Sequence, residues 1–187
     1  KDKKLYENEN VVKVNTKELL DDLNFPEAIN FTRKISKQDK NIDLIMNLQG
    51  DEPLMNIEDI RNLNDQMIKN QSQLGTLASE IKDKVLYKNE NIVKVNTKEY
   101  LDDLNFPEAI NFTRKISKQD KNIYHHLGIY CYKKETLKDF ISYNQSANEI
   151  KNRLEQLRAL DNNIRINVAL AKSSPIGVDT EEDFLAI

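Results

Sequence analysis

Cysteine and glycine are scarce in this chain, and no long apolar run is present. Cys131 is the only cysteine among 187 residues, which excludes an internal disulfide and a zinc site built from paired cysteines. The chain has four glycines, against the ~13 that average usage would give. No apolar run reaches the ~18 residues that a membrane-spanning helix needs, and no signal peptide opens the chain. We therefore expect a soluble, cytoplasmic, globular protein.

Neither sign of charge is in large excess. The 28 Lys and Arg residues against 31 Asp and Glu residues leave a formal net charge of −3. A nearly balanced chain lacks the basic field that drives binding to nucleic acid or to an anionic membrane. We therefore expect no nucleic acid and no membrane among its partners. The length is sufficient for one domain with a sizeable core.

A long internal repeat is present in the sequence. Residues 1–42 recur as residues 82–123, and only four of the 42 aligned positions differ. Two copies separated by 39 unrelated residues do not form a solenoid, which usually needs about three stacked units. We interpret residues 1–42 as a recent duplication or a chimeric join without a domain of its own. Residues 43–187 are then one partial domain.

Strand and helix patterns alternate after residue 42. The run 43–49 is nearly continuously apolar, which is typical of a strand that is buried on both faces and belongs to a parallel sheet. Asn56 is placed to cap a helix with an apolar stripe at Ile57, Ile60, Leu63 and Met67. Further strands are predicted over 74–81, 91–96, 108–114, 127–132 and 164–170, and further helices over 149–160 and after Thr180. The alternation predicts the α/β fold class.

The sharpest local motif is the pentapeptide 49–53, Gln-Gly-Asp-Glu-Pro. It follows a predicted strand, and ligands of open α/β sheets bind beyond the carboxyl ends of strands. Asp51 offers a hard oxygen ligand for Mg²⁺. The alternative interpretation is a polar turn that ends at Pro53, and the local sequence favours neither. In the motif 177–180, Asp179 on its own is best explained by a turn or a helix cap, unless it converges with Asp51 on one metal ion.

The two histidines are adjacent, at positions 125 and 126. On a strand, His125 and His126 point to opposite faces and cannot chelate one metal ion as a simple pair. We interpret each as a hydrogen-bonded residue at a strand edge. Cys131 is interpreted as a small core residue.

Three polar residues have both a functional and a structural interpretation. Arg114 ends a predicted strand and has the planar fork that binds a carboxylate through two hydrogen bonds, although most arginines have no such role. Arg33 is its duplicate in the first copy. Glu155 and Gln156 lie on a predicted amphipathic helix, where a solvated polar face is the simpler explanation.

Eight segments in one order resemble a known family. They are DLIMNLQGDEPL (43–54), LGTLAS (74–79), NENIVKV (89–95), INFTRKI (110–116), YHHLGIYCYKKETL (124–137), RLEQLRAL (153–160), IRINVAL (164–170) and GVDTEEDF (177–184). Together they resemble 3-deoxy-manno-octulosonate cytidylyltransferase, the CMP-Kdo synthetase family. The resemblance implies a Rossmann-like nucleotidyltransferase fold with a mixed sheet, in a cytoplasmic homodimer. It also implies transfer of CMP from CTP to Kdo, giving CMP-Kdo and pyrophosphate for lipopolysaccharide synthesis.

The resemblance also assigns roles to individual residues. Asp51 and Asp179 are implied to be the catalytic carboxylates that bind Mg²⁺, and Gln49 to lie against the nucleotide and the sugar. The residues implied to line the Kdo site are Arg114, His126, Tyr130, Glu155 and Gln156. A cation beside Kdo is physically reasonable, because this sugar carries a carboxylate.

The chain departs from the family pattern at its beginning. The family's N-terminal part carries a basic loop that cradles the CTP phosphates, and here residues 1–42 are a copy of the middle region instead. We therefore expect a fold that is incomplete at its N-terminus and an impaired activity. Two alternatives stay open: a non-catalytic fragment or dimerising interaction protein, and a cytidylyltransferase for another acidic sugar.

The repeat interpretation makes the first prediction. Deleting residues 1–42 leaves the remaining fold no less stable, because the second copy already supplies the same strands. Thermal unfolding of the full and truncated chains measures this, and a large fall in the melting temperature of the truncated chain would contradict it.

Overall fold

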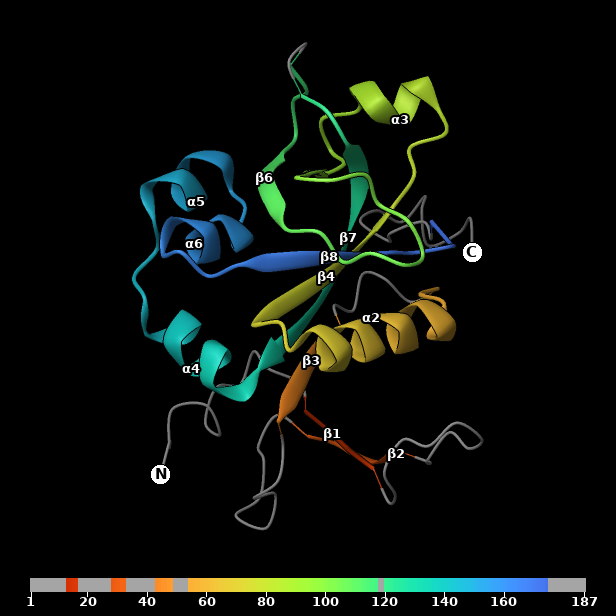
Figure 1. The fold of residues 1–187 in the computed structure, drawn as a ribbon. Helices are drawn as coiled ribbons and strands as arrows, with labels where there is room; N and C mark the ends of the chain where they lie inside the picture. Colours follow the sequence, from red (N-terminus) through yellow and green to blue (C-terminus); the bar gives the residue numbers. More distant parts are fainter. Residues whose placement is uncertain (1–12, 17–27, 33–42, 49–53, 118–119, 175–187) are drawn as a thin grey trace.

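The computed structural model describes residues 13–16, 28–32, 43–48, 54–117 and 120–174 (Figure 1). Its strands are β1 (Lys13–Thr16), β2 (Ala28–Thr32), β3 (Leu44–Leu48), β4 (Leu74–Ser79), β5 (Lys94–Thr97), β6 (Ala109–Thr113), β7 (Ile123–Lys133) and β8 (Ile166–Leu170). Its helices are α2 (Ile57–Asn70), α3 (Lys84–Lys88), α4 (Lys134–Ser142), α5 (Ala147–Asn152) and α6 (Gln156–Asp161).

The long strand β7 is the centre of a six-stranded sheet. Its beginning pairs with β5 and its end with β3, while its other edge pairs with β4, and all three pairings are antiparallel. The sheet continues from β5 to an antiparallel β6 and from β4 to a parallel β8. Parallel and antiparallel neighbours in one sheet with helices confirm the expected α/β fold with a mixed sheet.

The two outer strands of this sheet also meet each other. The backbone N–H of Val168 in β8 donates to the carbonyl of Pro107, 2.9 Å away, just before β6. Next to this bond, Glu108 and Asn167 form an isolated bridge, and the Asn167 side chain donates to the carbonyl of Phe106 at 2.7 Å. The sheet therefore curls until its first and last strands touch.

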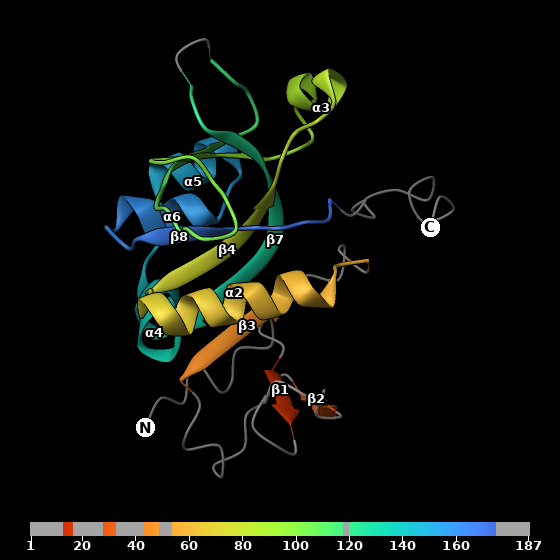
Figure 2. The ribbon, with the colours of Figure 1, turned by 45° about the vertical axis from the view of Figure 1, so that its right-hand side comes forward.

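Helices cover both faces of the sheet (Figures 1 and 2). Leu63 and Met67 of α2 pack with Leu77, Leu127 and Ile129 on one face. The other face packs against α4 and α6. The buried helical and loop residues of that second cluster are Leu101, Leu137, Phe140, Leu154, Leu157, Ala159 and Ile164. Because successive side chains of a strand point to opposite faces, β7 contributes to both clusters.

Helix α2 begins where the sequence predicts it. The Asn56 side chain accepts a hydrogen bond from the Glu58 backbone N–H at 2.9 Å, which confirms the predicted cap. Leu63 and Met67 are fully buried as predicted, but Ile57 is 47% exposed, so the stripe does not extend to the first turn.

Two element predictions are wrong in detail. The apolar run 43–49 predicts a strand of a parallel sheet that is buried on both faces, whereas β3 runs antiparallel to β7, and Ile45 is the only one of its residues that is buried. An apolar run indicates burial but carries no information about the direction of the neighbouring strand. The predicted helix 149–160 is two helices, because Arg153 adopts a left-handed conformation with φ 54°. Ile150, an apolar residue of the predicted amphipathic helix, is 61% exposed.

The other predicted strands are present, with boundaries that differ by a few residues. Helices α3 and α4 have no counterpart among the predicted elements. The Thr180 helix lies outside the described residues. In the part of the chain that the structure describes, no helix is long and apolar enough to cross a membrane.

The two repeat copies form the same hairpin in different surroundings. β1 and β2 pair antiparallel with Lys13 opposite Thr32, and β5 and β6 pair with Lys94 opposite Thr113, which are the equivalent positions of the second copy. Both hairpins also shift register between the same Asn and Thr. The second copy belongs to the six-stranded sheet, whereas β1 and β2 form a separate two-stranded sheet.

Gly75 in β4 is required by the close approach of α2, and its substitution gives a stability prediction. A Cβ atom there would lie 2.6 Å from Met67 Sδ and 2.9 Å from Phe106 Cζ. We expect Gly75→Ala to reduce the free energy of unfolding by about 1–3 kcal/mol through overpacking. Urea denaturation measures this loss. The control Leu104→Ala changes a side chain that is 85% exposed, and an equal loss in both variants would contradict the packing argument.

Candidate functional site

A row of aromatic rings lies on one face of β7. The Tyr130 ring lies between those of His126 and Tyr132. Its centroid is 5.5 Å from that of His126 and 6.1 Å from that of Tyr132. Phe112 of β6 packs edge-on against His126 at 5.0 Å, and Phe140 of α4 packs against Tyr132 at 5.8 Å. The row arises because even-numbered residues of β7 share one face.

His126 is buried in the centre of the sheet, so the interpretation as a strand-edge residue is wrong. Its Nε2 lies 2.9 Å from the hydroxyl of Thr76 in β4. That hydroxyl has one proton, which it donates to the Ile129 carbonyl at 2.7 Å. On this assignment Nε2 of His126 carries the ring proton and Nδ1 is an acceptor. Burial, followed by the nearby His125, lowers the pKa of His126 to about 3, so the ring is neutral.

His125 lies on the opposite face, as predicted for adjacent strand residues. Its Nδ1 is 3.1 Å from the hydroxyl of Ser174, beyond the end of β8. Burial, followed by the charge of Lys94, lowers the pKa of His125. The two histidines therefore do not form one site.

Tyr130 is a buried phenol, 8% exposed. Burial, followed by the neighbouring Tyr132 and Glu155, raises the pKa of Tyr130 well above its ordinary value, so the phenol keeps its proton. The Glu155 carboxylate is linked to the aromatic row through Arg158, which donates to it at 3.3 Å and lies over the Phe140 ring. Glu155 is exposed, whereas Gln156, the first residue of α6, is buried.

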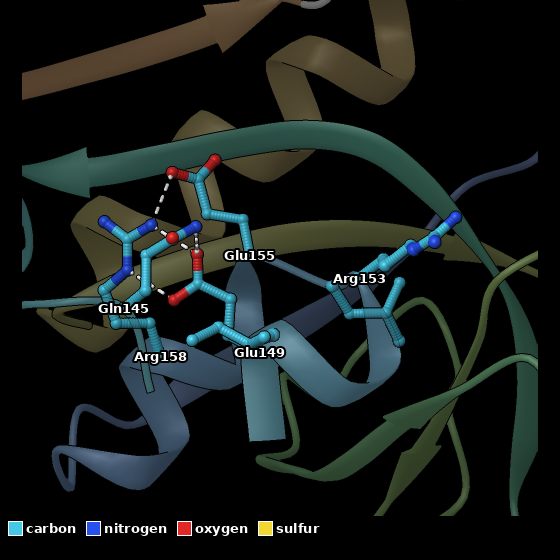
Figure 3. Close-up of a pocket in the computed structure, with 7 residues that line it drawn as sticks. Gln145, Glu149, Arg153, Glu155 and Arg158 are labelled. Carbon is cyan, nitrogen blue, oxygen red and sulfur yellow. Dashed lines mark hydrogen bonds and ion pairs between the residues drawn. The ribbon is translucent and has the colours of Figure 1, made fainter. Parts of the chain in front are cut away.

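Glu155 also lines a pocket of about 430 Å³ between α5 and α6 (Figure 3). The lining residues are Gln145, Glu149, Ile150, Arg153, Leu154, Glu155 and Arg158. Glu149 accepts two hydrogen bonds from the Arg158 guanidinium, of which the bond to Nε is 2.7 Å long. Arg158 also donates to Glu155 at 3.3 Å and lies over the Phe140 ring. Its charge is therefore neutralised inside the protein.

Arg114 follows the last residue of β6 and binds backbone carbonyls. Its Nη1 donates to Asn91 at 2.7 Å and to Glu90 at 3.4 Å. Within the described part of the chain, it makes no hydrogen bond or ion pair with His126, Tyr130 or Glu155. Arg114 is connected to the aromatic row through the backbone, because Phe112, two residues earlier in the chain, packs against His126.

Three predicted site residues, Gln49, Asp51 and Asp179, lie outside the described residues. In the described ranges, no group of three or more His, Cys, Asp and Glu side chains could hold a metal ion. The predicted metal site therefore stays a prediction.

A buried carboxylate shortly after the motif 49–53 binds the segment shortly before the motif 177–180. Asp59, in the first turn of α2, is 2% exposed. It accepts hydrogen bonds from the backbone N–H groups of Lys172 and Ser173 at 2.9 and 3.1 Å, and from the Ser173 hydroxyl. The helix that follows the motif 49–53 is thus joined to the segment that precedes the motif 177–180. Sequence alone indicates only a favourable acidic residue near a helix N-terminus.

Two further residues have roles that no local pattern indicated. Lys94 in β5 is fully buried, and Thr76 orients His126. Cys131 is buried and faces the α2 side, where burial raises the pKa of its thiol to about 12, as expected for a core residue.

Comparisons with known proteins agree on one family. A family model described as cytidylyltransferase matches residues 13–166. The chain is 37% identical over 140 residues to the 3-deoxy-manno-octulosonate cytidylyltransferase of Bartonella tribocorum, covering 74% of this chain and 57% of that protein. It is 41% identical over 145 residues to the protein of that name from Thermodesulfovibrio yellowstonii, covering 75% and 57%. The chain thus spans about 57% of the length of these curated relatives.

A solved structure is also similar. It is the structure of CMP:2-keto-3-deoxy-manno-octonic acid synthetase complexed with CTP, with a TM-score of 0.69 and 26% sequence identity. The similarity covers 80% of this chain and 61% of that one. The chain is therefore similar to this protein in its fold as well as in its sequence.

The burial of His126 makes the stability depend on pH. The pKa of His126 is about 3 in the folded chain against 6.5 for the free side chain, so between these values only the unfolded state binds the proton. Lowering the pH below 6.5 therefore destabilises the fold, with a contribution from His126 of about 1.4 kcal/mol per pH unit. His126→Gln removes that contribution.

Urea denaturation at about pH 7 and about pH 5 measures the difference. The loss of unfolding free energy between the two pH values should be smaller in His126→Gln than in the unmodified chain. His125→Gln is the comparison: burial also lowers the pKa of that half-buried ring, so this variant should reduce the pH dependence by less than His126→Gln does. An unchanged pH dependence in His126→Gln would contradict the assignment.

Proposed function

This chain belongs to the cytidylyltransferase family, and we propose that it is part of an enzyme that transfers CMP from CTP to 3-deoxy-manno-octulosonate (Kdo). The products are CMP-Kdo and pyrophosphate, for lipopolysaccharide synthesis in the cytoplasm. The observation that carries the proposal is the buried pair His126 and Tyr130 with Glu155 beside it, in a chain similar to Kdo cytidylyltransferases over about three quarters of its length. We also propose that the enzyme is a homodimer.

The side chains around the aromatic row have the chemistry that an acidic sugar requires. Tyr130 supplies a proton for a hydrogen bond, and neutral His126 supplies an acceptor at Nδ1. The Glu155 carboxylate accepts hydrogen bonds from sugar hydroxyls. Gln156, as an amide, both donates and accepts.

Arg114 is proposed to bind the sugar carboxylate. A guanidinium has five N–H donors, and within the described part of the chain only Nη1 of Arg114 makes hydrogen bonds. The edge formed by Nε and Nη2 therefore remains able to bind a carboxylate through two parallel hydrogen bonds. In this arrangement the sugar lies between Arg114 and the aromatic row.

In the proposed reaction the anomeric hydroxyl of Kdo attacks the α-phosphorus of CTP. The hydroxyl releases its proton to water as a phosphorus–oxygen bond to the sugar forms, the bond to the β-phosphate breaks, and pyrophosphate leaves. The protein contributes mainly by holding the two substrates in line. Gln49 is proposed to lie against the nucleotide and the sugar.

Asp51 and Asp179 are proposed to hold Mg²⁺, which would neutralise charge on the phosphates. Their carboxylates are the hard oxygen donors that this ion prefers. The hydrogen bonds of Asp59 to Lys172 and Ser173 support the proposal, because they bring together the segments that adjoin the two motifs.

Kdo binding by the 187-residue chain tests the proposal. Calorimetric titration should show binding to the unmodified chain and about tenfold or greater weakening in Arg114→Gln, the size expected for losing charge-assisted hydrogen bonds. Arg33→Gln is a matched control, because it makes the same change in the first repeat copy, which lacks the histidine and tyrosine context downstream. No Kdo binding, or equal effects of the two variants, would overturn the proposal.

Two further measurements separate the alternatives. Tighter binding of a sialic acid than of Kdo would favour a cytidylyltransferase for another acidic sugar. Pyrophosphate release from CTP with Kdo and Mg²⁺ tests the transfer itself. A chain that binds Kdo but releases no pyrophosphate, even at high enzyme concentration, would favour the non-catalytic alternative.

A further inference from the structure

Lys94 is an unusual residue because its entire side chain is buried. It is 0% exposed and lies in β5, with Thr113 of β6 and His125 of β7 as its cross-strand neighbours. Burying an ammonium group without hydrogen-bond acceptors is strongly destabilising. A buried lysine is therefore found only where its N–H groups have acceptors. The position of those acceptors indicates what Lys94 does.

The Lys94 ammonium binds two backbone carbonyls from different segments. It donates to the carbonyl of Asn89, before β5, and to the carbonyl of Arg114, after β6, at 3.0 Å. It therefore joins the chain that enters the hairpin to the chain that leaves it. The backbone of Arg114 is held at this junction.

The same junction also holds the Arg114 side chain. The two carbonyls that accept hydrogen bonds from Arg114 Nη1 belong to Glu90 and Asn91, directly after Asn89. Lys94 thus holds the segment that binds the guanidinium and the backbone that carries it. Glu90 also forms an ion pair with Lys115 at 3.3 Å on the exposed side of this junction.

The charges around Lys94 are consistent with this role. Burial lowers the pKa of Lys94, while the Glu90 carboxylate opposes that effect and the Arg114 guanidinium adds to it. Two cations thus share one cluster of carbonyl oxygens, and neither has a hydrogen bond to a carboxylate side chain in the described residues. The position of the Lys94 ammonium relative to the Arg114 guanidinium therefore depends on these backbone carbonyls.

We propose that Lys94 is a positioning residue for Arg114, which keeps the free edge of the guanidinium oriented before an acidic sugar binds. The role of Arg114 in sugar binding rests on the proposed function above. An arginine side chain loses rotamer entropy when it is fixed. Holding Arg114 in place in the free protein removes part of that cost from the binding step.

The orientation of Arg114 can be measured without any ligand. In a ¹H–¹⁵N spectrum, the guanidinium Nε–H signal, assigned by its loss in Arg114→Lys, reports how well this side chain is ordered. We expect a distinct, slowly exchanging signal in the unmodified chain. Lys94→Met, which keeps the length of the side chain and removes its donors, should move the signal to an averaged position. Lys94→Arg, which retains donors, should restore it in part.

The repeat offers a matched control for this experiment. Lys13→Met makes the same substitution at the equivalent position of the first copy and should leave the Arg114 signal unchanged. Lys94→Gln keeps a single donor group and should give an intermediate effect, which covers the case in which Lys94→Met does not fold. An ordered Arg114 signal in folded Lys94→Met, or an unchanged Arg114 signal in folded Lys94→Gln where Lys94→Met does not fold, would overturn the proposal.

Titration with Kdo then separates positioning from simple support of the fold. We expect about tenfold weaker Kdo binding in Lys94→Met, with unchanged binding in Lys13→Met. A loss of Kdo affinity without a change in the Arg114 signal would show that Lys94 acts in another way. An unmodified chain that fails to bind Kdo refutes the proposed function, and the ligand-free signal still decides the role of Lys94.

Discussion

The fold and the candidate site both depend on the pairing of β7 along both of its edges. This strand pairs with β5 and β3 on one edge and with β4 on the other. Its odd-numbered residues pack towards α2 and its even-numbered residues towards α4 and α6. A change of register by one residue would exchange these two sets. The contact of His126 with Thr76 and the row formed with Tyr130 follow from this register.

Buried ionic groups join segments that are distant in the sequence. Asp59 connects α2 to the segment after β8, Lys94 connects the two ends of a hairpin, and Glu149 connects α5 to Arg158 of α6. An uncompensated charge in the interior is strongly destabilising, so each group strongly favours the arrangement that provides its partners. These contacts hold polar side chains in defined places in the fold.

The repeat separates local from long-range information. Two nearly identical segments form hairpins with the same register and the same irregularity, so these features are encoded within about forty residues. Only the second copy joins the six-stranded sheet, because its β5 follows β4 in the chain and pairs with β7. This position in the sheet brings Phe112, two residues before Arg114, against His126 of β7. Identical residues in the first copy have no equivalent downstream segment.

The amino-acid sequence by itself determined the α/β class, the cap at Asn56, most strands and the resemblance to one family, because these depend on periodicity, capping and the order of motifs. The tertiary structure alone decided that β3 runs antiparallel, that the helix predicted over 149–160 breaks at Arg153, and that Lys94 is buried. It also placed Asp59 beside Lys172 and kept Arg114 out of hydrogen-bonding contact with His126. The physical reason is that strand direction and charge compensation are set by partners many residues away, which no local pattern records.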